Sequence, residues 1–110
     1  MLREADPVRI VLTTASTVDE GRGLARALVE RRLAACVNVI PNLHSTYRWQ
    51  GEVEEAAEVL LVIKTTAEYL PALEAAVREL LSYEVPEFLA LDVESAGQPY
   101  LEWLLGSVGK

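Results

Sequence analysis

Cysteine and histidine are almost absent from this chain of 110 residues, since each occurs only once. A single cysteine cannot close an internal disulfide, so we expect a cytoplasmic protein rather than one from an oxidising compartment. A single histidine leaves no Ser/His/Asp set to assemble. On this ground we predict that the protein is not an enzyme.

The sequence also lacks long apolar runs and an excess of basic residues. No apolar run approaches the roughly 20 residues of a membrane-spanning helix, so we expect no membrane partner. The formal net charge of −7 argues against nucleic acid as a partner, because such binding depends largely on Lys and Arg that neutralise phosphates. Residues Met1 to Asp6 mix both charge signs without an apolar segment, and we interpret them as a loose tail, not a signal peptide.

What the sequence does contain is a clear succession of strand and helix patterns. Hydrophobic residues make up 51% of the chain, enough for one domain over residues 1–110. Thr17 and Glu20 form a capping-box pattern, which predicts the start of a helix. The expected order is a strand over 8–16, a helix from 18 to about 32, a hairpin over 34–66, a helix entered between 66 and 71 and ending near 82, a strand over 87–95, and a last helix over 98–108.

The longest feature is the hairpin, whose turn we expect near Gln50 and Gly51. Most odd-numbered positions of both arms are apolar, and side chains alternate between the two faces of a strand. If the apolar sets share one face, the numbers of two paired residues must sum to an even number. The loop between the two strands must then contain an odd number of residues. We therefore predict a three-residue connection, or a type I turn with Gly51 as a left-handed bulge residue, and exclude a two-residue turn. The expected pairs are Val39 with Leu61 or Ile63, and Leu43 with Ala57 or Val59.

This order predicts an α+β fold, namely a ferredoxin-like βαββαβ sandwich with a C-terminal helix and a long hairpin between its second and third strands. Two helices cover only one face of such a four-stranded sheet. Residues 59–63 and 88–91 are nevertheless apolar on both faces, so the second face should be buried as well. We infer a homo-oligomer whose sheets face inward.

Five motifs stand out along the chain: ERRLAACVNVIP (30–41), YRWQGEVEE (47–55), LLVIKTT (60–66), YEVPE (83–87) and YLEWL (100–104). Together they resemble the CutA family, the divalent-cation tolerance proteins, in order over residues 8–108. The resemblance implies a tight homotrimer with its sheets packed inside and its long hairpins reaching onto neighbouring subunits. It also implies a role in tolerance of, or response to, divalent metals, copper in particular.

Two residues are candidate metal ligands, Cys36 and His44. Cys36 lies in the ACVN motif, where a thiolate would bind a soft metal such as copper; the alternative, which we favour, is a small buried strand residue. His44 is either a ligand or, as we favour, a surface residue of the hairpin. On a straight strand the two lie about 27 Å apart, so a joint site needs different subunits. In many relatives the stretch before YEVPE reads His-Pro, but this chain has Leu81-Ser82.

Four residues of the family motifs are candidates for a cleft between subunits: Trp49, Lys64, Tyr83 and Glu84. The alternative for the two aromatic residues is that they only pack across the interface. The second arm of the hairpin is acidic at Glu52, Glu54, Glu55 and Glu58. We interpret these glutamates as a solvated edge that discourages strand pairing, rather than as a cation site.

Three functional classes remain. We favour a non-catalytic, trimeric divalent-cation tolerance protein that needs no cofactor and whose partners are its own copies and divalent cations, copper first. The alternative is a small-molecule sensor, because fold and trimer resemble the nucleotide-binding PII signalling proteins; against it, Gly21 and Gly23 lie in a helix start and form no phosphate loop. The third class is an enzyme such as an acylphosphatase. A resemblance to acylphosphatases would imply a site with an arginine and an asparagine near the first strand, and the loop 13–19 contains neither residue.

Overall fold

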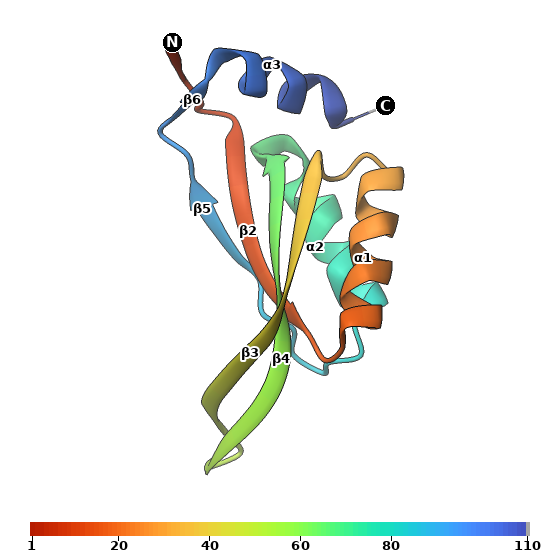
Figure 1. Cartoon of the computed structure of the whole chain (residues 1–110). Helices are drawn as coiled ribbons and strands as arrows, with labels where there is room; N and C mark the ends of the chain where they lie inside the picture. Colours follow the sequence, from red (N-terminus) through yellow and green to blue (C-terminus); the bar gives the residue numbers. More distant parts are fainter. Residues whose placement is uncertain (110) are drawn as a thin grey trace.

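The computed structural model describes residues 1–109 (Figure 1). Four antiparallel strands form its main sheet. Their order across the sheet is β3-β4-β2-β5. Both α1 and α2 lie on one face of this sheet, and the hairpin of β3 and β4 projects beyond them (Figure 1). The predicted α+β sandwich with a C-terminal helix is confirmed. The elements are β1 (Leu2–Glu4), β2 (Val8–Ala15), α1 (Val18–Glu30), β3 (Cys36–Trp49), β4 (Glu52–Thr66), the 3-10 turn η1 (Ala67–Tyr69), α2 (Leu70–Leu80), β5 (Leu89–Asp92), β6 (Ser95–Gly97) and α3 (Gln98–Ser107).

The first helix begins at the predicted cap. The Thr17 hydroxyl oxygen accepts a hydrogen bond from the Glu20 amide at 3.0 Å. The Glu20 carboxylate does not return to the Thr17 amide as a capping box requires, but accepts from the Ser16 amide at 2.9 Å. One turn later, a Cβ at Gly21 would lie 3.4 Å from methyl carbons of Val39 and Val59. Glycine at this position therefore lets α1 approach the sheet closely.

The core lies between the two helices and the sheet. Val59, Leu61 and Ile63 of β4 are buried on the helix-covered face, as alternation along a strand requires. Leu60 and Val62 lie between them on the opposite face and are only half-buried. The helices complete the core with apolar side chains at helical spacing: Leu24, Leu28, Leu73, Ala76 and Val77.

The opposite face of the sheet, which we call the open face, is apolar but uncovered within the described chain. Ile40, Leu89 and Leu91 are 46%, 55% and 47% exposed there. Helix α3 lies across one end of the sheet (Figure 1) and packs on the small cluster around Ala5, Val8 and Ala35. Residues 59–63 of β4 and 88–91 at β5 therefore place apolar side chains on both faces of the sheet, as expected.

The hairpin turn differs from the prediction. Trp49 pairs with Glu52 across a two-residue loop, in which Gln50 and Gly51 both have positive φ (52° and 84°), as in a type I′ turn. A loop of this length was excluded by the argument from paired numbers, and that exclusion was wrong. The argument assumed an uninterrupted ladder, whereas the register shifts between Ile40 and Leu43.

The register shift is a β-bulge, at which β3 carries one more residue than β4. Asn42, inside the bulge, has a left-handed φ of 67°, which asparagine tolerates better than most residues. Val39 pairs with Leu61, one of the two expected partners, but Leu43 pairs with Glu58 instead of Ala57 or Val59. One extra residue exchanges the two faces of β3 beyond the bulge.

The exchange moves the aromatic side chains of the hairpin. Tyr47 and Trp49 pair with Glu54 and Glu52, which stand on the open face with Leu60 and Val62. They were expected on the same face as Val37 and Val39, which contact the helix-covered core. That expectation was wrong, because it assumed that the side chains of β3 alternate between the two faces without interruption at the bulge.

The N-terminal residues were interpreted as a loose tail, and this was also wrong. Leu2–Glu4 form β1 and pair antiparallel with β6, and the Gln98 amide donates to the Met1 carbonyl at 3.0 Å. Ala5 is fully buried beside Leu101 and Leu104 of α3. The tail was misread because its partner strand is more than 90 residues away in the sequence and leaves no local signal.

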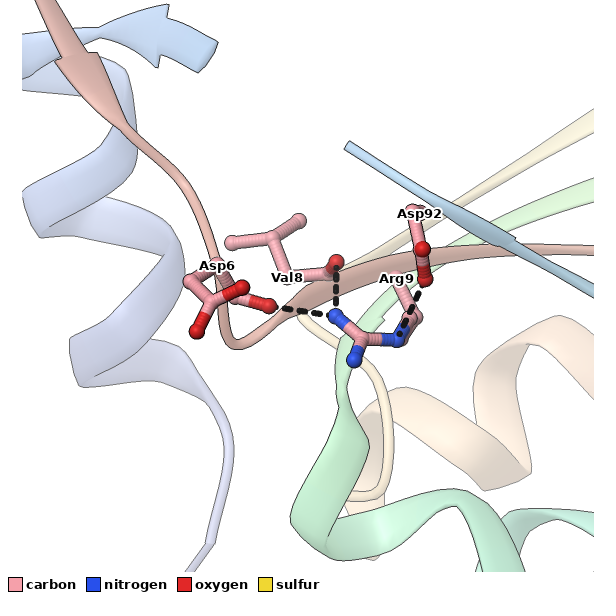
Figure 2. Close-up of polar contacts among 4 residues, drawn as sticks. All are labelled: Asp6, Val8, Arg9 and Asp92. Carbon is pink, nitrogen blue, oxygen red and sulfur yellow. Dashed lines mark hydrogen bonds and ion pairs between the residues drawn. The ribbon is translucent and has the colours of Figure 1, made fainter. Parts of the chain in front are cut away.

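The last strand of the main sheet is shorter than expected, since β5 ends at Asp92 and the following residues form β6. Figure 2 shows the arginine that stabilises this corner. Arg9 forms an ion pair with Asp92 at 3.2 Å and donates to the main-chain carbonyls of Asp6 and Val8. Asp92 is 91% exposed, so the ion pair itself contributes little, and the carbonyl bonds fix the turn before β2.

No helix among residues 1–109 is long and apolar enough to cross a membrane.

Two glycine substitutions test the geometry of the hairpin turn, one in the turn itself and one in α1 for comparison. Gly51→Ala places a side chain at φ 84° and should lower the free energy of unfolding by about 1 kcal/mol. Gly23→Ala lies in α1, where an added Cβ meets nothing within 4 Å, and should raise it by about 1 kcal/mol. Urea unfolding at one fixed protein concentration measures both. Equal effects of the two substitutions would contradict the turn geometry.

Candidate functional site

A cleft of about 610 Å³ lies where the open face of the hairpin meets the loop between α2 and β5. Trp49, Tyr83 and Glu84, three of the four residues predicted for a cleft between subunits, line this cleft within one chain; the predicted cleft between subunits stays a prediction. The remaining lining residues come from β2, from both arms of the hairpin and from the loop: Thr14, Ser45, Thr46, Tyr47, Glu58, Val85, Pro86 and Glu87. The β-bulge is what brings Tyr47 and Trp49 to this side of the hairpin.

A hydrogen bond crosses the cleft from the loop to the sheet. The Tyr83 hydroxyl donates to the Glu58 carboxylate. Burial, this bond and the negative charge of Glu58 raise the pKa of Tyr83 well above its usual value. The phenol therefore remains protonated at neutral pH and acts as a donor, not as a base.

A second carboxylate, that of Glu87, lies in the same cleft. Burial and the nearby charge of Glu58 raise its pKa above the usual value. The loop is fixed beneath it, because the Thr13 hydroxyl donates to the Glu87 carbonyl at 2.6 Å. Three carboxylates and three aromatic or phenolic side chains give the cleft a negative, partly apolar lining.

Sequence reasoning did not identify Glu58 or Glu87 as cleft residues. The short distance from Tyr83 within YEVPE offered a signal for Glu87, but this residue was assigned to the start of the strand expected over 87–95. Glu58 was grouped with the exposed glutamates of the hairpin, and only the bulge shows that it shares a face with the aromatic residues. Glu52, Glu54 and Glu55 are exposed, as expected for a solvated edge.

Lys64, the fourth predicted cleft residue, does not line this cleft. It lies near the other end of β4, where it pairs with Cys36 and its ammonium donates to the Asn38 side-chain carbonyl. Cys36 is half-buried on the open face rather than in the core beneath the helices. Burial and the nearby Cys36 raise the pKa of Tyr100 on α3 above its usual value.

His44, the second candidate ligand, is exposed and pairs with Ala57. It borders a shallow hollow of about 250 Å³ at the start of α1, together with Ser16 and Thr17. Because the bulge exchanges the faces of β3, Cys36 and His44 lie on opposite faces of the sheet. They cannot share an ion within one chain.

The described residues do not provide a complete metal site within one chain. No group of three or more His, Cys, Asp or Glu side chains that could hold an ion occurs in residues 1–109. Cys36 supplies one soft sulfur, and its cross-strand neighbour is a cation, whereas soft metals need two or more such ligands. Cys36 by itself therefore does not complete a soft-metal site.

Comparison with known proteins agrees with this fold and these motifs. Residues 9–107 match the family described as CutA1 divalent ion tolerance protein. The "Divalent-cation tolerance protein CutA" of Thermus thermophilus is 48% identical over 91% of this chain and 97% of its own length. "Protein CutA" of Mus musculus is 53% identical over 74% of this chain, which spans 46% of that longer protein.

A solved structure extends the agreement to the backbone. The structure of CutA from Synechococcus elongatus PCC7942 is 39% identical, covers 99% of this chain and 96% of its own, and superposes with a TM-score of 0.94. The agreement includes the hairpin and α3, since the shared region is nearly the whole chain. On the family match and the identity of its relatives, this chain belongs to the CutA1 divalent ion tolerance family.

Proposed function

We propose that this protein acts as a non-catalytic homotrimer in the tolerance of divalent cations, and that copper is the foremost of these cations. The observation that carries the proposal is the open face of the sheet, which is apolar, uncovered in the monomer and bears Cys36. The names of the family and of the Thermus relative support a divalent cation, since both mention tolerance of divalent ions.

Hydrophobic burial supplies the driving force for assembly. Ile40, Leu89 and Leu91 are each about half exposed in one chain. Covering a few hundred Å² of such surface contributes several kcal/mol per subunit at about 25 cal/mol per Å². Three copies with their open faces inward would bury this surface and bring their Cys36 side chains onto one shared interior.

Convergence of Cys36 residues would resolve the shortage of ligands within one chain. Each subunit contributes one sulfur, and two or three sulfurs make a soft site that prefers copper over calcium or magnesium. The proposed cation partner is therefore bound between subunits, and no resident cofactor is needed. The single cysteine, which has no disulfide partner in its own chain, suits a reducing compartment, and we place the protein in the cytoplasm.

The cleft supports a second candidate function, the sensing of a small molecule. Its aromatic residues offer stacking surfaces, and its carboxylates offer hydrogen-bond acceptors. Glu58, Glu84 and Glu87 would repel a triphosphate, so the lining favours a neutral or cationic molecule over a nucleotide. A thermal-shift screen that compares copper, ATP and organic amines separates the two functions, because each ligand stabilises only the state that binds it.

Assembly is tested by substituting aspartate, one position at a time, for two neighbouring residues on opposite faces of β4. Leu61→Asp buries a charge beneath the helices and should prevent folding. Val62→Asp places the charge on the open face, where the monomer leaves it partly exposed, and should permit folding but prevent assembly. Light scattering should give three times the 12.1 kDa chain mass for the unchanged protein and one times that mass for Val62→Asp.

Circular dichroism of Val62→Asp serves as the control for its fold. A monomeric mass for the unchanged chain at micromolar concentration would contradict the proposed trimer. So would a Val62→Asp variant that remains trimeric.

The metal site is tested by Cys36→Ser, with His44→Ala as its matched control in the same strand. If the Cys36 sulfurs converge, Cys36→Ser should weaken copper binding at least a hundredfold, because a hydroxyl is a poor ligand for a soft metal. His44→Ala should leave copper affinity unchanged. Calorimetric titration should also give one copper ion per trimer.

The stoichiometry distinguishes the alternatives. One ion per chain that survives Cys36→Ser would exclude the shared sulfur site. Loss of that binding in His44→Ala would then place the ligand on the hairpin.

A further inference from the structure

The carboxylate of Glu20 joins two segments that are distant in the sequence. One oxygen accepts hydrogen bonds from the Ser16 amide and hydroxyl at 2.9 and 2.8 Å. The other oxygen accepts from the Ser82 amide at 2.9 Å. Ser16 lies between β2 and α1, and Ser82 directly follows α2 and its cap Leu81. A single side chain on the first turn of α1 therefore holds the start of the loop that lines the cleft.

These hydrogen bonds are made to a charged acceptor. Burial opposes ionisation of Glu20, but the bonds from Ser16 and Ser82 together outweigh it and lower the pKa of Glu20 below its usual value. The carboxylate is therefore ionised at neutral pH. Hydrogen bonds to an ionised acceptor are stronger than those between neutral groups, so this contact suits a role as an anchor.

The anchor is adjacent to the residue that spans the cleft. Tyr83 immediately follows Ser82, and its hydroxyl donates to Glu58 on β4. At the other end of the loop, the Thr13 hydroxyl holds the Glu87 carbonyl. The loop has no helix or strand between Ser82 and Phe88, so its path depends on such fixed points. The bond from the Ser82 amide to Glu20 is the main-chain fixed point adjacent to Tyr83.

We propose that Glu20 is a positioning residue for the cleft, which fixes the start of the loop so that Tyr83 reaches Glu58. The start of α1 and the lining of the cleft then move together. The functional meaning of this link rests on the proposed use of the cleft as a ligand site. The link itself does not, and its test needs no ligand.

The test is Glu20→Asp, which keeps the negative charge but shortens the side chain by one methylene, so that it cannot span both Ser16 and Ser82. Retaining the charge matters because Tyr83 is surrounded by Glu58, Glu20 and Tyr47, each of which raises its pKa through charge. If Glu20 positions the loop, the pKa of Tyr83 should fall by about one pH unit or more, towards the ordinary value of about 10. The ¹³Cζ shift of labelled tyrosine, assigned with Tyr83→Phe, measures this.

The matched control is Thr17→Ala, which removes the cap of the same helix but leaves the bonds of Glu20 to Ser16 and Ser82 in place. It should lower the melting temperature without moving the pKa of Tyr83. An unchanged pKa of Tyr83 in Glu20→Asp would overturn the proposal. An equal fall in Thr17→Ala would overturn it too, because general loosening of the helix start would then be sufficient.

A second variant removes the donor instead of the acceptor. Ser82→Pro lacks the amide proton, and the extended ψ of 150° at Leu81 suits a residue that precedes proline. In a Ser82→Pro background, Glu20→Asp should no longer change the pKa of Tyr83. A full effect of Glu20→Asp in that background would overturn the proposed path. Because none of these measurements uses copper or another ligand, failure of the proposed function would leave their outcome untouched.

Discussion

The pairing of β4 with both of its neighbours is the constraint on which the rest of this structure depends. As the second strand of the hairpin and an inner strand of the sheet, β4 must satisfy two ladders and two faces at once. Its odd-numbered side chains close the core beneath α1 and α2, and alternation then leaves Leu60 and Val62 on the opposite face. An apolar open face is thus a geometric consequence of this strand, because no helix of the described chain lies over its centre. The proposed assembly would cover this face.

The β-bulge in β3 gives the two halves of the hairpin different tasks. On the sheet side of the bulge, Val37 and Val39 contact the helix-covered core. Beyond it, Tyr47 and Trp49 stand on the open face and line the cleft with Glu58. One residue inserted at Asn42 therefore allows a single strand to complete a hydrophobic core and also to present aromatic side chains on the other side. The cleft would not exist in this form with an uninterrupted ladder.

Sequence patterns predicted much of this architecture and little of the site. The capping residue Thr17, the order of the elements and the pair of Val39 with Leu61 were all accessible from local patterns. The turn length and the tail were not, because the bulge and the pairing of β1 with β6 arise from contacts between distant segments. Three of the four residues predicted for a cleft between subunits come together in a cleft within one chain, while Lys64 lies at the far end of β4 beside Cys36.

The sequence by itself determined the family, the α+β class and the presence of apolar residues on both faces of the central strands, because motifs, capping and alternation are local properties of the chain. Only the tertiary structure decided which face each hairpin residue occupies, since a one-residue bulge inverts every side chain beyond it. It also decided that Glu58, Tyr83 and Glu87 share one cleft, and that Glu20 joins the end of α2 to the start of α1. These contacts connect residues far apart in sequence, and no periodicity in the chain encodes them.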